Sequence, residues 1–132
     1  MRRLSPTLLT LLLALAWGCG KPDLPAPYSS LEAPEALLLS VQAGDRGREL
    51  FLKYCAICHG EKADGRGVRQ MLSSSATDFT DRAWQRRSAP VYTYYIIREG
   101  KQGTPMPSWK VLDESETWDL VAYVLSVADE AP

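Results

Sequence analysis

Residues 55–59 read Cys-Ala-Ile-Cys-His and hold the only histidine and two of the three cysteines of this 132-residue chain. C-x-x-C-H is the spacing of covalent haem attachment. Two thiols one helical turn apart can each add to one of the two vinyl groups of a haem, and the next residue can then present an imidazole to the iron. We therefore predict that Cys55 and Cys58 form thioethers with one haem c and that His59 is the proximal iron ligand.

Other uses of this cysteine pair stay open at this point. A zinc ribbon needs four ligands, usually from two C-x-x-C pairs, and the chain has one such pair. A thioredoxin-like dithiol occurs beside a βαβ unit, whereas no alternating strand pattern is visible here. A plain disulfide or a chance match is the remaining alternative. Haem attachment is favoured because the chain begins with an export signal, and haem c is attached outside the cytoplasm.

That export signal occupies residues 1–18. Arg2 and Arg3 give it a positive start, and the apolar run at 8–17 is about half of the ~20 residues that a membrane span requires. A short apolar run after a positive start is typical of a secretory signal peptide. The run has no polar stripe, which argues against the alternative of a buried amphipathic helix.

The end of this signal, Leu-Ala-Trp-Gly-Cys at 15–19, resembles the cleavage site of a bacterial lipoprotein. A small residue, Gly18, precedes the cysteine that such a signal acylates, although Trp17 is bulkier than the usual residue. The resemblance implies a lipid on Cys19, with ordinary cleavage nearby as the alternative. Gly20 replaces the Asp that retains such proteins at the inner membrane. We expect a location on the periplasmic side of a membrane, with the outer membrane favoured.

The composition and the length of the chain limit its fold class and its number of domains. Hydrophobic residues make up 45% and charged residues 23%, which excludes wholesale disorder, and 132 residues suffice for one small domain. The net charge of −1 argues against a nucleic-acid partner. We predict a signal peptide at 1–18, a lipidated and proline-rich tether at 19–43, and a single domain at 44–132. Residues 31–41 form either a short helix on the domain or a contact to a partner.

The domain is predicted to be all-α, with three to four helices and long loops. Apolar residues at helical spacing predict helices over 45–59, 90–99 and 113–127, with Asp45 and Ser88 as candidate N-caps. Residues 113–116 resemble a capping box. Roughly 85 residues with such long loops would form a marginal core, so a bound group is expected to fill the centre.

Residues 44–128 resemble a class I c-type cytochrome domain. The resemblance depends on the C-x-x-C-H motif, on a Gly-x-x-Met-Pro motif at 103–107, and on a helix pair. It implies that Gly47 and Phe51 of the first helix cross Leu120 and Tyr123 of the last, with Gly47 allowing close backbone approach. An ordinary amphipathic core would also account for these four residues.

A second axial ligand is needed for a haem that carries electrons, and the chain has no second histidine. Met106 lies between Pro105 and Pro107, and the resemblance implies that it is the distal iron ligand. Met71 precedes a serine run and is the alternative, as is a lysine. Trp109 follows the Met106 loop and is a candidate for the haem pocket.

The sequence does not decide the roles of several side chains expected near the haem. The aromatic and basic side chains expected near the haem can equally serve as core or as solvated charge: Trp84, Tyr94, Tyr95, Arg86 and Arg87. A hydrogen-bond acceptor for the second ring nitrogen of His59 is expected. The sequence does not identify that acceptor.

The resemblance implies single-electron transfer by a membrane-anchored monohaem cytochrome with His59 and Met106 as axial ligands. Its expected partners are a redox donor and acceptor that dock at the haem edge, and the protein is not expected to be an enzyme by itself. A haem subunit of a larger membrane oxidoreductase is one alternative. A gas-binding haem sensor is another, if Met106 is not a ligand.

The charges divide along the chain. Residues 44–110 carry 12 basic and 7 acidic groups, whereas residues 111–132 carry 6 acidic groups and no basic one. This division predicts redox partners that present an acidic patch to the haem edge. The alternative is that both segments are simply solvated surfaces.

Overall fold

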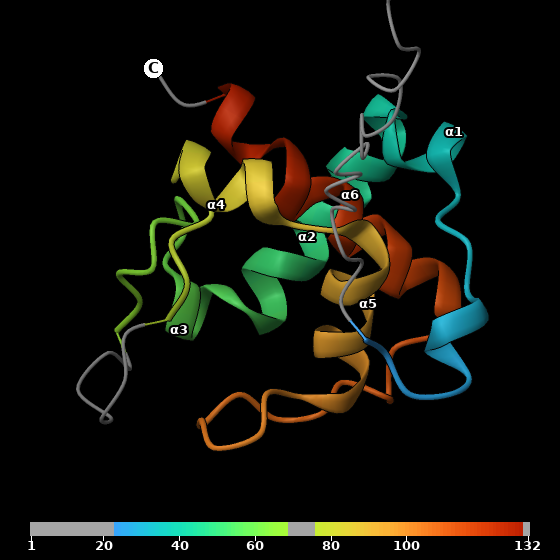
Figure 1. Ribbon diagram of the computed structural model, residues 1–132. Coiled ribbons are helices and arrows are strands. Elements are labelled where there is room, and N and C mark those ends of the chain that lie inside the picture. The colour runs from blue at the N-terminus through green and yellow to red at the C-terminus, as the bar shows by residue number, and fades with distance from the viewer. Residues whose placement is uncertain (1–22, 69–75, 131–132) are drawn as a thin grey trace, which may run out of the picture.

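The structure, a computed structural model, describes residues 23–68 and 76–130. Within these ranges the regular elements are all helices, as Figure 1 shows. They are the 3₁₀-helix η1 (Tyr28–Ser30), α1 (Glu35–Leu38), α2 (Val41–Tyr54), α3 (Ala56–His59), α4 (Arg82–Arg87), α5 (Pro90–Glu99) and α6 (Glu114–Glu130). The all-α prediction is confirmed. Of the helices described, none is long and apolar enough to cross a membrane.

The centre of the fold is the crossing of α2 and α6, which pack more extensively than any other helix pair described. A Cβ atom placed on Gly47 would lie 1.9 Å from the backbone oxygen of Asp119 and 2.9 Å from Cβ of Tyr123. Only glycine allows this approach. Phe51, Leu120 and Tyr123 are buried in one core cluster beside the crossing. The predicted crossing of these helices is therefore confirmed.

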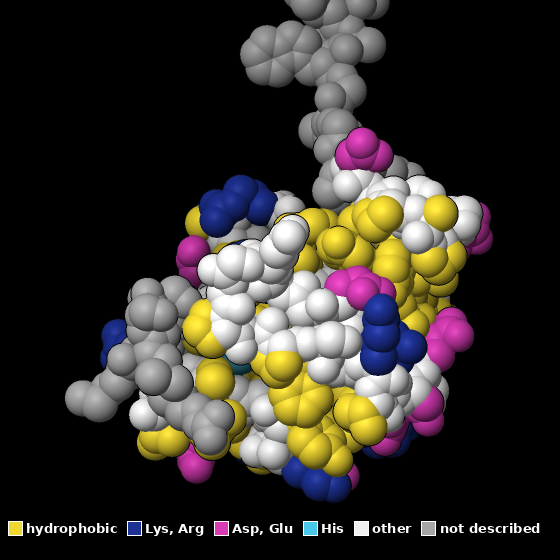
Figure 2. Space-filling model, turned by 90° about the horizontal axis from the view of Figure 1, so that it is seen from below, with side chains coloured by type: hydrophobic (Ala, Val, Ile, Leu, Met, Phe, Trp, Pro, Cys, Tyr) yellow, Lys and Arg dark blue, Asp and Glu magenta, His cyan; other side chains and the backbone are white. Residues whose placement is uncertain are grey.

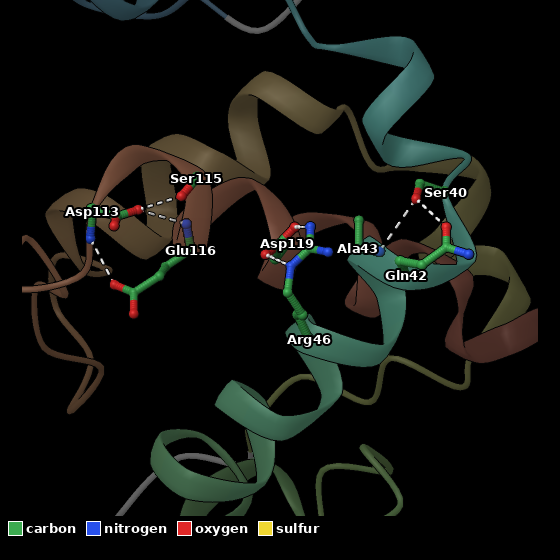
Figure 3. A network of polar contacts seen from close by, with 8 residues as sticks. All are labelled: Ser40, Gln42, Ala43, Arg46, Asp113, Ser115, Glu116 and Asp119. Carbon is green, nitrogen blue, oxygen red and sulfur yellow. Dashed lines mark hydrogen bonds and ion pairs between the residues drawn. The ribbon is translucent and has the colours of Figure 1, made fainter.

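A polar contact fixes the same crossing from the side (Figure 3). Nε and Nη2 of Arg46 each lie 2.7 Å from one carboxylate oxygen of Asp119. The Asp119 side chain is buried and the Arg46 side chain is largely exposed. Such a two-point contact sets the rotation of α2 against α6, because both oxygens must meet the planar guanidinium.

The ends of these two helices differ in how well the sequence predicted them. At the start of α6, the backbone N–H of Glu116 donates to Asp113 and that of Asp113 donates to Glu116, so the capping box is confirmed. The N-cap of α2 is Ser40, whose hydroxyl accepts from the N–H of Ala43. The predicted cap at Asp45 is wrong, because the helix starts one turn earlier.

The structure has more helices than the three to four predicted. Short helices account for the difference, since α1 and α3 have four residues each and α4 has six. Asp81 caps α4 by accepting from the N–H of Ala83. The N-cap of α5 is Ala89, whereas the Ser88 hydroxyl donates to the carbonyl of Trp84 and closes α4. Pro90 is the first residue of α5, as predicted.

Residues 23–38, here called the N-terminal strap, pack on the domain from Tyr28 onward. The Tyr28 ring lies 5.0 Å from the ring of Tyr95, and its hydroxyl donates to Glu99 at the end of α5. Further apolar side chains of the strap pack on the cluster of Tyr94, Trp118 and Val121: Leu31, Ala33, Leu37 and Leu38. Packing on the domain, one of the two alternatives for residues 31–41, is therefore observed for residues 31–38, whereas Leu39 and Val41 are exposed and a partner contact there stays a prediction. The part of the predicted spacer from Tyr28 onward is packed as well.

Candidate cofactor site

A cavity opens between α3, α5 and the loops that flank α4. Its volume is about 240 Å³, and it is partly open to solvent. Cys55, His59 and Met106, three of the residues singled out in the sequence, line it together. Most of its remaining wall is apolar: Phe51, Phe79, Trp84, Ile96, Ile97, Leu120 and Val124. Figure 2 shows a broad group of hydrophobic side chains on the face that it draws.

The two cysteines lie on one helical turn. Cys55 is the residue between α2 and α3, and its carbonyl accepts from the N–H groups of Cys58 and His59. Both thiols are free and half-buried. Burial, with the nearby Cys58 as a smaller cause, raises the pKa of Cys55 to about 12. The Cys55 thiol is therefore protonated at neutral pH.

A glycine packed against the motif was missed in the sequence. A Cβ atom on Gly67 would lie 2.4 Å from the carbonyl carbon of Cys58 and 2.5 Å from the carbonyl oxygen of Ile57. The Gly67 N–H also donates to the carbonyl of Cys58. The loop after the motif can therefore cover α3 only with glycine at this position. The Gly-x-Gly pair at 65–67 was the available signal.

The imidazole of His59 is held by one loop from two sides. Its Nδ1 lies 3.2 Å from the backbone carbonyl oxygen of Thr77, and because a carbonyl only accepts, Nδ1 is the donor. The Phe79 ring stacks on the imidazole at 4.7 Å with an interplanar angle of 19°. Burial lowers the pKa of His59 below its ordinary value. The ring is therefore neutral at pH 7, with the lone pair of Nε2 free to bind a metal.

The Met106 loop is fixed mainly by backbone contacts. Met106 is half-buried, its carbonyl accepts from the N–H of Lys101, and its own N–H donates to the hydroxyl of Thr104. These bonds hold the methionine at the cavity wall, between two prolines. The structure thus brings the predicted distal ligand into the same cavity as His59.

Trp109 lies elsewhere. It is not among the residues that line the cavity, and its ring packs 5.5 Å from the ring of Tyr54. Its backbone N–H donates to the carbonyl of Ile97, which ties the end of the Met106 loop to α5. The side chain therefore serves the core beside the cavity.

The remaining aromatic and basic candidates divide between cavity and core. Trp84 lines the cavity, whereas Tyr94 packs on Trp118 and Tyr95 on the strap. Arg87 and Lys101 are the charged side chains on the cavity wall apart from His59, and Arg86 is not part of it. Cys19, Met71 and the signal peptide lie outside the described residues.

The side chains that line the cavity indicate which metal or cofactor it could bind. Across residues 23–68 and 76–130, no three His, Cys, Asp or Glu side chains are grouped to hold a metal ion directly. His59, Met106 and the Cys55 thiol line the apolar wall, and Cys58, which is not among the lining residues, lies one helical turn after Cys55. This donor set suits a haem, whose porphyrin supplies four of the six iron ligands. Arg87 and Lys101 suit its two carboxylates. The residues present therefore fit the group that the C-x-x-C-H motif predicts.

The comparison with known families agrees with this geometry. The family model described as "Cytochrome C oxidase, cbb3-type, subunit III" matches residues 42–124. The match spans more than half of the chain, from the first turn of α2 to the middle of α6. It includes the motif at 55–59, the cavity and the Met106 loop.

Proposed function

The chain belongs to the family of cbb3-type cytochrome c oxidase subunit III, a family of c-type cytochromes, and we propose that it transfers single electrons with one covalently bound haem c. Cys55 and Cys58 would hold the haem through thioethers. His59 and Met106 would be its axial ligands. No acid–base pair or nucleophile is needed for this role, so we propose that the protein is not an enzyme by itself.

The observation that carries this proposal is the presence of an imidazole and a thioether on one apolar cavity. When bound there, a haem supplies the one-electron couple of its iron. Thr77 keeps a proton on Nδ1 of His59 and so leaves Nε2 as the donor atom. The thioether of Met106 is a soft donor that favours the reduced state, and the apolar wall limits access of water. If His59 and Met106 both bound the iron, they would leave no coordination position for a gas.

The test compares Met106→Ala with Met71→Ala in the haem-loaded protein. We expect the wild type and Met71→Ala to show the far-red iron–thioether band in the oxidised spectrum, and Met106→Ala to lose it. A band that survives in Met106→Ala contradicts the ligand assignment. If the wild type lacks the band and binds carbon monoxide readily, the gas-sensor alternative replaces the proposal.

We further propose that residues 1–18 are removed on export and that Cys19 carries the lipid on the periplasmic side. Each buried methylene of an acyl chain contributes about 0.8 kcal/mol, so two or three chains anchor firmly. Cys19→Ser should move the protein from the membrane fraction to the soluble fraction. Unchanged membrane association in Cys19→Ser would contradict the lipid anchor.

A haem subunit of a membrane oxidoreductase is the second candidate. The family match favours it. Packing against the domain begins at Tyr28, nine residues after Cys19, and nine extended residues span at most about 30 Å. A lipid on Cys19 would thus keep the domain near the membrane, where membrane-bound partners are. Purification in mild detergent separates the candidates, since fixed-ratio co-purifying chains support the subunit and their absence supports the shuttle.

Charge supports a class of redox partner. Residues 44–110 have a net charge of +5, and Lys101 and Arg87, both on the cavity wall, are exposed. We propose that donor and acceptor dock at the haem edge with acidic patches. Electron transfer should then slow as ionic strength rises. A rate independent of salt would argue for the alternative of solvated surfaces.

A further inference from the structure

The side chain of Gln85 joins two parts of the cavity wall. Its Nε2 lies 3.0 Å from the backbone carbonyl oxygen of Phe79 and 2.6 Å from that of Val124. Gln85 belongs to α4, Phe79 to the preceding loop, and Val124 to the buried face of α6. One amide group therefore connects a loop to the most buried helix of the domain.

The loop that Gln85 reaches is the one that holds His59. Residues 77–79 contact the imidazole twice, through the carbonyl of Thr77 on Nδ1 and through the stacked ring of Phe79. The loop is held at Phe79 from two sides, because its N–H donates to the carbonyl of Ala63 and its carbonyl accepts from Gln85. The bond from Gln85 ties it to the backbone of α6.

We propose that Gln85 is a positioning residue that fixes loop 77–79 on α6 and thereby sets the orientation and donor strength of the His59 imidazole. The inference rests on the proposed role of His59 as an iron ligand. The bond from Nδ1 to the Thr77 carbonyl shifts electron density toward Nε2, which makes the imidazole a stronger donor. A better donor stabilises the more highly charged iron. Gln85 therefore lowers the reduction potential by holding the carbonyl in place.

Holding both carbonyl oxygens requires a side chain at position 85 that can donate two hydrogen bonds. One amide nitrogen carries two hydrogens and can donate to two carbonyls at once. Gln85→Met keeps the length and removes both donors. Gln85→Glu keeps the shape, accepts only, and places a carboxylate against two carbonyl oxygens. Both variants should release the loop while leaving the thiols, His59 and Met106 unchanged.

The test uses the haem-loaded protein and two readouts of the His59 ring. In the reduced state, NMR follows exchange of the Nδ1 proton with solvent, and we expect Gln85→Met and Gln85→Glu to exchange about tenfold faster than the wild type, as one lost hydrogen bond allows. The reduction potential should become more positive in both variants. If one variant does not fold, the other carries the test.

Ser40→Ala is the matched control. It removes the N-cap bond of α2, one hydrogen bond of similar worth, at the opposite end of that helix from Phe51, the residue through which α2 contacts Phe79. We expect both readouts to stay at wild-type values there. Unchanged readouts in the Gln85 variants, or equal changes in Ser40→Ala, overturn the proposal. Absence of histidine ligation in the wild type would instead overturn the proposed function, so the two failures are distinguishable.

Discussion

Replacement of Gly47 by alanine is the sharpest test of the helix crossing on which the cavity depends. The added Cβ would lie 1.9 Å from the backbone oxygen and 2.5 Å from the carbonyl carbon of Asp119. Real Cβ atoms essentially never approach closer than 3.0 Å, so α2 and α6 would have to separate by about 1 Å. The obstacle is backbone, which cannot rotate away as a side chain can.

The expected cost follows from two opposing effects. Overpacking of a core typically costs about 1–3 kcal/mol, and a backbone obstacle places Gly47→Ala at the upper end. Alanine regains about 1 kcal/mol of helix propensity over glycine. We therefore expect a net loss of about 2 kcal/mol in the free energy of unfolding, measured by urea denaturation with far-UV circular dichroism.

Gly44 offers a control within the same helix. A Cβ atom on Gly44 meets no atom within 4 Å, so Gly44→Ala should gain about 0.5–1 kcal/mol from propensity alone. The difference between the two variants removes the propensity contribution that they share. Equal stability of Gly47→Ala and Gly44→Ala would refute the crossing geometry.

Three further predictions concern the core, the strap and pH. Phe51→Ala should lower the free energy of unfolding by about 3–5 kcal/mol, because the ring is 1% exposed; urea denaturation checks this. Tyr28→Phe should cost about 0.5–1.5 kcal/mol by the same assay, since it removes the bond from the strap to Glu99; an unchanged midpoint would show that this bond adds no stability. Lys110, followed by Tyr28, holds the pKa of Glu99 below its ordinary value of 4.5, so the stability that this carboxylate contributes is present above pH 4.5 and lost as pH falls further. Glu99→Gln should flatten the pH dependence of thermal unfolding below pH 4.5, and an unchanged slope would contradict it.

The parts of the site that the sequence predicted are those encoded within a few residues. The spacing of Cys55, Cys58 and His59 reflects one helical turn, which needs no knowledge of the remaining fold. The capping box at 113–116 is likewise a local pattern. Met106 was predicted from its flanking prolines, the absence of a second histidine and the family resemblance, and it lines the cavity together with His59; its ligation of iron stays a prediction.

The parts that it did not predict depend on contacts between distant segments. The acceptor for His59 is the backbone carbonyl of Thr77, 18 residues away, and a carbonyl carries no side-chain signature. The proline-rich composition of the strap suggests an extended spacer, yet tertiary packing of Tyr28 and Leu31 holds it on the domain. Trp109 was assigned by proximity to Met106, and its packing on Tyr54 lies outside any local rule.

The central claim is that Cys55 and Cys58 hold a haem covalently. A haem stain after denaturing electrophoresis tests it most directly, because only covalently attached haem stays with the unfolded chain. The wild-type protein, exported in a host that attaches haem c, should stain, and the double variant Cys55→Ala with Cys58→Ala should not. A wild-type band of the full protein without stain would contradict the account.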